Sequence, residues 1–88
     1  MFWSLAFSPK AQKEFKKLDV SVQKQIREYF FQRVLKAPDP LVFAKHLRYD
    51  LSDFYRFRIE NYRVLCSVQR HKLTIHVVKI GHRREVYY

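Results

Sequence analysis

The fold is decided by residues 54–70, FYRFRIENYRVLCSVQR. This stretch contains two runs of β-branched and aromatic residues, 54–59 and 62–70, with only Glu60 and Asn61 between them. Two runs of this composition joined by two residues are typical of a β-hairpin. We therefore predict two antiparallel strands with a tight turn at Glu60 and Asn61.

The two-residue turn also fixes the register of this hairpin. Arg58 is then opposite Arg63, and Arg56 is opposite Leu65. Because directly paired side chains share a face of the sheet, all three arginines fall on one side. The other side, available to the helices, carries the apolar set Tyr55, Phe57, Ile59, Tyr62, Val64, Cys66 and Val68.

Three arginines on one small sheet face point to a phosphate ligand. Like charges directly opposite one another are destabilising unless an anion bridges them. The guanidinium group offers a rigid fork of donors that matches phosphate oxygens. The alternative is a solvated basic face. A third predicted strand, 73–80, is joined by His71 and Lys72 and adds His76 beside Ser67 on the same face.

The residues before the hairpin predict a strand followed by two helices. Alternating apolar positions in 2–7 are typical of a short strand. Ser8 and Pro9 form a helix start, and Ser21 is the expected N-cap of a longer second helix that ends before 38–40, Pro-Asp-Pro. The apolar stripe of that second helix is Val22, Ile26, Tyr29, Phe30, Val34 and Leu35.

These elements predict one α+β domain over residues 1–88. Its sheet is expected to have four strands, with the N-terminal strand beside the three-stranded antiparallel meander and the two-helix hairpin on one face. Residues 41–53 are predicted to be irregular, with Leu41, Phe43 and Leu47 against the core.

The composition restricts the kinds of partner. The 88 residues carry a net charge of +10, which favours a polyanionic partner such as nucleic acid. No apolar run approaches the roughly 18–20 residues of a membrane-spanning helix, so we expect no membrane partner. The single cysteine, Cys66, excludes an internal disulfide and favours the cytoplasm.

The last eight residues, GHRREVYY at 81–88, are dense in groups that bind phosphate or transfer protons. Gly81 is the only glycine, and its position suggests a sharp turn after the last strand. We expect the tail to close over the sheet face that holds Arg56, Arg58 and Arg63. The alternative is a frayed basic terminus.

The elements YRxRxxxYRV (55–64) and GHRxEVY (81–87), in this order and spacing, resemble the RelE/StbE branch of the RelE/ParE toxin superfamily. The similarity covers essentially the whole chain. It implies a RelE-like fold and a toxin of a type II toxin–antitoxin system that enters the ribosomal A site and cleaves mRNA there. The implied reaction is attack of a ribose 2′-OH on the adjacent phosphate, without a metal or another cofactor.

The resemblance also implies roles for individual residues. Arg63 would bind the scissile phosphate and its developing charge, and Arg83 would be a second phosphate clamp or the donor to the leaving oxygen. Tyr87 would stack on a base or orient the 2′-OH. Arg56, Arg58 and Arg84 are expected to bind the RNA backbone, and no residue is expected to bind a metal.

Some RelE toxins have lysines where Arg56 and Arg58 stand. An arginine does not accept a proton at any usable pH. We therefore name His82 as the first candidate for a general base, because the unperturbed pKa of histidine is about 6.5. The other candidates are His76, Tyr87, Asp50, Asp53 and the ribosomal RNA.

The expected partners are the ribosome, its mRNA and a cognate RelB-like antitoxin whose acidic segment binds the basic surface. The toxin is expected to be a monomer within a toxin–antitoxin hetero-oligomer. One alternative is a ParE-like inhibitor of DNA gyrase. Others are a non-catalytic RNA-binding module and an inactive copy, since the sequence stops at Tyr88 directly after the second motif.

Overall fold

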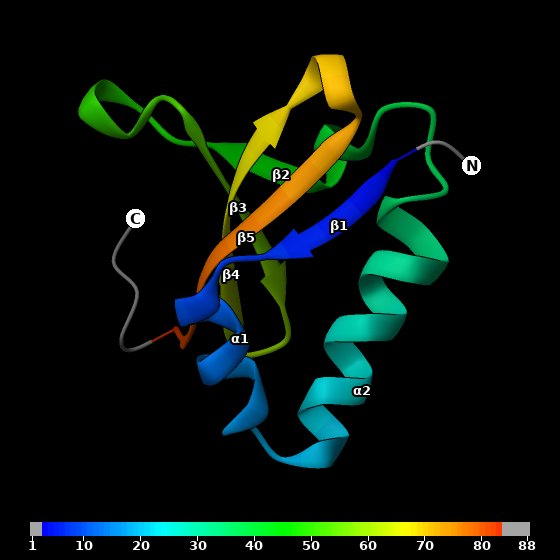
Figure 1. The fold of residues 1–88 in the computed structure, drawn as a ribbon, viewed down its shortest axis with the longest axis vertical. Helices are drawn as coiled ribbons and strands as arrows, with labels where there is room; N and C mark the ends of the chain where they lie inside the picture. Colours follow the sequence, from blue (N-terminus) through cyan, green and yellow to red (C-terminus); the bar gives the residue numbers. More distant parts are fainter. Residues whose placement is uncertain (1–2, 84–88) are drawn as a thin grey trace.

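The computed structural model describes residues 3–83 and shows an α+β fold with one mixed sheet (Figure 1). The order of the strands across the sheet is β1-β5-β4-β3-β2. The strands are β1 (Ser4–Phe7), β2 (Ala44–His46), β3 (Phe54–Ile59), β4 (Tyr62–Gln69) and β5 (Thr74–His82). The predicted fold class is confirmed, but the sheet has five strands where four were expected.

The helices form as an antiparallel pair after β1. Helix α1 spans Pro9–Lys16, and the Ser8 hydroxyl caps it by accepting a hydrogen bond from the Ala11 N–H at 3.1 Å. Helix α2 spans Val20–Tyr29 and continues into a π-helical turn at Phe30–Val34.

The expected N-cap of α2 at Ser21 is wrong. Asp19 holds the N-cap position, and its carbonyl accepts the first intrahelical bond from the Gln23 N–H at 2.9 Å. Both residue types suit an N-cap, so composition alone did not decide between the two positions.

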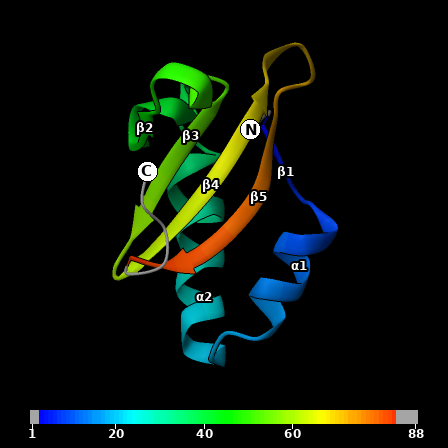
Figure 2. The same cartoon turned by 90° about the vertical axis from the view of Figure 1, so that its left-hand side faces the viewer.

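The hydrophobic core lies between α2 and the sheet (Figure 2). Phe30 and Phe57 pack edge to face at its centre, with ring centroids 5.0 Å apart. The predicted apolar face of the hairpin is confirmed at its centre, where Phe57, Val64 and Cys66 are fully buried. The predicted stripe of α2 also faces this core through Ile26, Phe30, Val34 and Leu35.

Residues 40–53 are more regular than expected. A 3-10 turn at Pro40–Phe43 leads into β2, whose three residues pair with β3. Leu41 and Leu47 are buried as predicted, whereas Phe43 is 38% exposed. The ring of Phe43 packs edge to face with that of Tyr29, with centroids 6.3 Å apart.

The β3–β4 turn has the predicted two residues, and Glu60 adopts a left-handed φ of 52°. The expected two-residue turn between β4 and β5 is wrong. A 3-10 turn at Arg70–Lys72 connects them, followed by Leu73 at a φ of 48°. Strand β5 also extends two residues beyond the predicted end, so it includes Gly81 and His82.

A β-bulge interrupts the pairing of β4 with β5. Leu65 is opposite Lys79 and the next residue, Cys66, is opposite Val77, so Val78 has no partner of its own. An extra residue of this kind shifts the side-chain alternation by one position. Val77 and Ile80 therefore both belong to the core, and the residues that follow the bulge change faces.

Helix α1 stabilises this bulge. The Glu14 carboxylate accepts a hydrogen bond from the Ile80 N–H at 2.8 Å, and the Ser8 hydroxyl donates to the Val78 carbonyl at 3.4 Å. Strand β1 pairs with β5 only as far as Val77, so these two side chains cover the edge of β5 where β1 has ended. The sequence signals for α1 and β5 do not reveal this contact.

Candidate nucleic-acid interface

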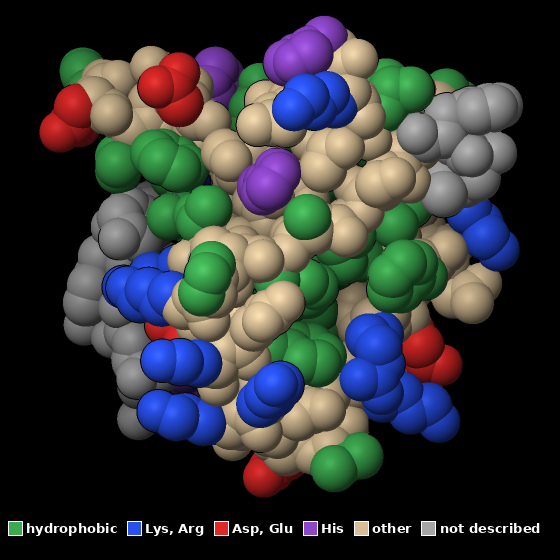
Figure 3. All heavy atoms as spheres, viewed as in Figure 1, with side chains coloured by type: hydrophobic (Ala, Val, Ile, Leu, Met, Phe, Trp, Pro, Cys, Tyr) green, Lys and Arg blue, Asp and Glu red, His purple; other side chains and the backbone are tan. Residues whose placement is uncertain are grey.

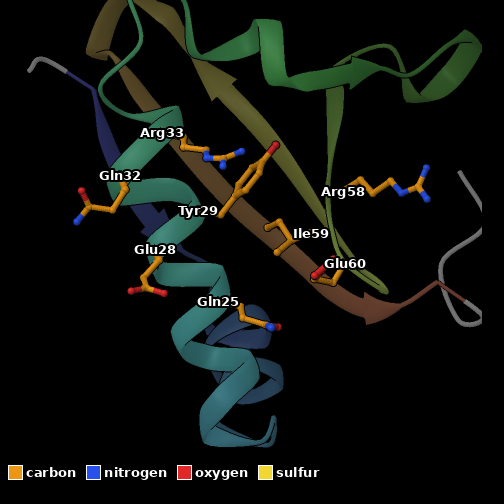
Figure 4. A pocket seen from close by; sticks show the side chains of 8 residues that line it. All are labelled: Gln25, Glu28, Tyr29, Gln32, Arg33, Arg58, Ile59 and Glu60. Carbon is orange, nitrogen blue, oxygen red and sulfur yellow. The ribbon is translucent and has the colours of Figure 1, made fainter.

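The structure confirms the predicted register of the β3–β4 hairpin. Arg58 is paired with Arg63, and Arg56 with Leu65. On β3 the arginines alternate with the buried Phe57, and on β4 Arg63 precedes the buried Val64. The arginine side chains therefore lie on the sheet face away from α2. Figure 2 looks onto this face, with α2 behind the strands, and Figure 4 shows Arg58 pointing away from α2.

Arg63 is held in place by the turn that precedes it. One guanidinium nitrogen, Nη1, donates to the backbone carbonyls of Glu60 at 3.1 Å and Tyr62 at 3.0 Å. A guanidinium group has five N–H donors, so this anchoring leaves donors for a ligand. The hairpin thus fixes the position of Arg63 before any ligand binds.

The arginines are close enough to affect one another. Partial burial lowers the pKa of Arg63, and the positive charges of Arg58, Arg56 and Arg83 lower it further. Repulsion of this kind disfavours the cluster in the absence of an anion. A bound phosphate would offset it, so the electrostatics of the site favour a phosphate ligand.

Arg83 reaches this cluster from the end of β5. Its backbone N–H donates to the Asn61 carbonyl at 2.7 Å, which attaches the residue to the β3–β4 turn. The predicted grouping of Arg56, Arg58, Arg63 and Arg83 is therefore present. Arg84 and Tyr87 lie outside the described residues.

Gly81 has a different role from the one expected. It is not a left-handed turn residue, because it lies within β5 directly opposite Arg63. On this face it presents only hydrogen where any other residue would place a side chain next to Arg63. Among residues 3–83, the strand position opposite Arg63 on β5 therefore carries no side chain.

His82 lies away from the arginine cluster. It is paired with Tyr62, and the two rings contact each other edge to face with centroids 5.5 Å apart. It also follows Gly81 in the strand, so its side chain lies on the other face of the sheet. His76 is paired with Ser67, as predicted, and lies on the face of the sheet that carries Arg56, Arg58 and Arg63, here called the arginine face. Its partner Ser67 is four residues along β4 from Arg63, so His76 is not next to Arg63.

Two further cationic residues of this face were not predicted from the sequence. Lys79 is paired with Leu65, and Lys45 is paired with Arg56. The bulge places Lys79 on this side, and β2 contributes Lys45. Neither feature has a signal in the sequence, because a bulge and a three-residue edge strand both depend on pairing with a neighbour.

A polar hollow of about 460 Å³ lies beside this region, between α2 and the end of β3 (Figure 4). Its lining consists of Gln25, Glu28, Tyr29, Gln32, Arg33, Arg58, Ile59 and Glu60. Burial raises the pKa of Tyr29, and the charge of Arg33 partly opposes this shift. Arg58 marks the boundary between the hollow and the arginine face.

The surface in general is strongly basic. On the face seen in Figure 3, most of the Lys and Arg side chains gather over the lower half of the molecule, over α1, α2 and the end of β5. Within residues 3–83, no three His, Cys, Asp or Glu side chains are placed to hold a metal ion together. None of the helices in this range is long and apolar enough to cross a membrane.

Comparison with solved structures finds the same fold in RelE toxins. A toxin–antitoxin RelBE complex from Mycobacterium tuberculosis matches with a TM-score of 0.81 and 23% identity, over 92% of this chain and 91% of that one. A RelE–RelB complex from Pyrococcus horikoshii matches with a TM-score of 0.73 and 23% identity, over 98% of this chain and 100% of that one.

A third structure contains Escherichia coli RelE with two arginines replaced by alanine, in complex with a peptide of the antitoxin RelB. It matches with a TM-score of 0.73 and 25% identity, over 99% of this chain and 97% of that one. No curated protein matches significantly.

The family model described as "ParE toxin of type II toxin-antitoxin system, parDE" matches residues 5–87, almost the whole chain. Its match agrees with the RelE-like fold and with the resemblance carried by the two sequence motifs. The chain therefore belongs to this toxin family and is a RelE-type member of the RelE/ParE superfamily of type II toxin–antitoxin systems.

Proposed function

We propose that this toxin is an endoribonuclease that cuts mRNA in the ribosomal A site and thereby stops translation. The observation that carries the proposal is the sheet face on which Arg63 is anchored among Arg56, Arg58 and Arg83. Such a cluster suits a ligand that carries phosphate and suits a reaction that builds negative charge on it.

The proposed reaction is an internal transfer of the phosphoryl group. The ribose 2′-oxygen forms a bond to phosphorus while the bond from phosphorus to the 5′-oxygen breaks. The 2′-OH loses its proton and the leaving 5′-oxygen gains one, so the products are a 2′,3′-cyclic phosphate and a 5′-OH. No metal and no cofactor take part.

Arg63 has the central role in this proposal. Its free donors would bind the non-bridging oxygens of the scissile phosphate and stabilise the charge that develops there. Arg83 would bind the same phosphate or donate to the leaving oxygen. Arg56, Arg58 and Arg84 would hold the RNA backbone, and Tyr87 would stack on a base or orient the 2′-OH.

Neither described histidine considered as a proton acceptor lies next to Arg63. His82 contacts Tyr62 on the other face, and His76 is distant from Arg63 along the sheet. We infer that positioning and electrostatic stabilisation provide most of the rate enhancement. The proton of the 2′-OH would pass to Tyr87 or to a group of the ribosomal RNA.

The proposed partners follow from the basic surface and from the related structures. RelE toxins are found with RelB antitoxins in the complexes from Mycobacterium tuberculosis and Pyrococcus horikoshii. We propose that a cognate antitoxin binds this toxin as a monomer within a hetero-oligomer. Its acidic segment would be attracted by the net charge of +10. The proposed compartment is the cytoplasm, where ribosomes and mRNA are available.

The test is to add the purified toxin to translating ribosomes and to map the 5′ ends of the mRNA. We expect new 5′-OH ends within the A-site codon, and far fewer of them with Arg63→Ala. The absence of new ends with active ribosomes would refute the proposal.

Two other functions make different predictions. The matching family model carries the name of ParE toxins, so gyrase inhibition has a specific observation in its favour. A toxin of that kind would inhibit DNA supercoiling and leave mRNA intact. A non-catalytic module that stacks bases on its sheet is disfavoured, because Phe57 is buried in the core and Tyr55 packs against it.

A further inference from the structure

The arginine face is organised in rows that cross the sheet. One row holds Arg58, Arg63 and Gly81, which are paired in sequence across β3, β4 and β5. The neighbouring row crosses four strands and consists of Lys45, Arg56, Leu65 and Lys79. All members of both rows are cationic except Gly81 and Leu65. The same face therefore presents two adjacent bands of positive charge.

The second row depends on the bulge in β5. If β5 continued to pair regularly beyond Val77, the side-chain alternation would turn Lys79 toward the core and Ile80 toward the arginine face. The bulge instead places Lys79 beside Leu65, and the contact of Glu14 with the Ile80 N–H stabilises this arrangement. Bulges commonly redirect a side chain next to a functional site.

The spacing of the rows suits a nucleic-acid backbone. Arg63 and Leu65 are two residues apart on β4, which separates the rows by about 6.6 Å. This separation is comparable to that of consecutive phosphates in an extended single strand. Leu65, 6% exposed, provides an apolar floor between Arg56 and Lys79, over which their long side chains can reach a common anion.

We propose that Lys45, Arg56 and Lys79 form a second phosphate subsite, adjacent to the one formed by Arg58, Arg63 and Arg83. The subsite binds the RNA phosphate next to the scissile one and so fixes the direction in which the strand crosses the sheet. This inference rests on the proposed function in taking RNA as the ligand, but it concerns binding and not cleavage.

The experiment compares two oligonucleotides that cannot be cleaved because every 2′-oxygen is methylated. The dinucleotide has one internucleotide phosphate and the trinucleotide has two, and both lack terminal phosphates. Binding to the 88-residue toxin is measured over a range of salt concentrations. The wild type is expected to bind the trinucleotide more tightly, with a salt slope steeper by roughly 0.7 for the additional phosphate.

The variants are Lys79→Met and Lys45→Met, which keep the apolar part of the side chain and remove the charge. Each is expected to weaken trinucleotide binding about fivefold, the upper range for one exposed ion pair. Neither changes dinucleotide binding. Lys24→Met, on the exposed side of α2, is the matched control and changes neither.

Arg63→Met distinguishes the two subsites, because it is expected to weaken binding of both oligonucleotides. The proposal is overturned if the wild type binds the two oligonucleotides equally tightly. It is also overturned if the double variant Lys45→Met and Lys79→Met still binds the trinucleotide more tightly than the dinucleotide, to the same degree as the wild type. The proposed function can fail separately. If the wild type binds the trinucleotide more tightly than the dinucleotide but does not cut mRNA on ribosomes, the second subsite is supported and the nuclease function is refuted.

Discussion

Arg63 is the residue on which the site depends most directly. It is anchored by the carbonyls of Glu60 and Tyr62, and burial and three neighbouring arginines lower its pKa. Its position was predictable from the sequence, because a two-residue turn leaves only one register for the hairpin. The role of Gly81 was not predictable, since it depends on the residue across the strand and not on the residues next to it.

Arg63→Ala should remove most of the activity without unfolding the protein. We expect mRNA cleavage on ribosomes to fall by roughly 100-fold to 1,000-fold, the usual loss for a donor to developing charge. The free energy of unfolding should change by less than about 1 kcal/mol, because the substitution also removes like-charge repulsion. Arg70→Ala, in the β4–β5 turn, is the control and should cleave normally. Equal loss in both variants would contradict this role.

Gly81→Val should separate stability from activity. Valine is favoured in strands, so the midpoint of urea unfolding should stay the same or rise. Its side chain would fill the space beside Arg63, and cleavage should fall by about tenfold or more, as a misplaced ligand commonly costs. Thr74→Val, at the other end of β5, is the matched control. Unchanged cleavage by Gly81→Val would show that this space is not used.

At the scale of elements, the local signals were sufficient for β1, α1 and the β3–β4 hairpin. They were insufficient for β2, because its three residues become a strand only by pairing with β3. The bulge in β5 was also hidden, because the run of apolar residues through Val77 and Val78 fits more than one register. These two features place Lys45 and Lys79 on the arginine face.

Glu14→Ala tests the contact between α1 and the bulge. Loss of the acceptor leaves the Ile80 N–H without its partner, so we expect the free energy of unfolding to fall by about 1–3 kcal/mol. Glu14→Gln, which keeps an acceptor oxygen, should lose less. Amide hydrogen exchange at Ile80 should become faster in the alanine variant. Glu28→Ala, on the exposed side of α2, is the control. If the Ile80 amide is as well protected in Glu14→Ala as in Glu28→Ala, the contact does not stabilise the bulge.

At the scale of the whole molecule, the small core holds an ionisable group. Cys66 is fully buried, and burial strongly raises the pKa of its thiol. The thiol is therefore protonated in the folded protein, whereas in the unfolded chain it ionises near pH 8.5. Stability from this difference is fully present below about pH 8.5 and is lost as the pH rises above it.

We accordingly expect the free energy of unfolding to decrease between pH 8.5 and 9.5, with a slope of at most about 1.4 kcal/mol per pH unit. Urea unfolding at several pH values measures this slope. Cys66→Ala should have a lower free energy of unfolding at every pH, but it should lack the decrease with pH that ionisation of the thiol causes. Equal slopes in the two proteins would show that other groups cause the dependence.

The parallel pairing of β1 with β5 has a consequence for synthesis. Ser4 is paired with Thr74, so the first strand acquires its neighbour only after the residues through β5 have left the ribosome. Until β5 emerges, the nascent chain lacks Lys79, Gly81 and Arg83, and β4 has one unpaired edge. A contact so distant in sequence also closes slowly. The candidate site is therefore assembled only after β5 has left the ribosome and paired with β4, so a nascent chain that ends before β5 does not yet present it.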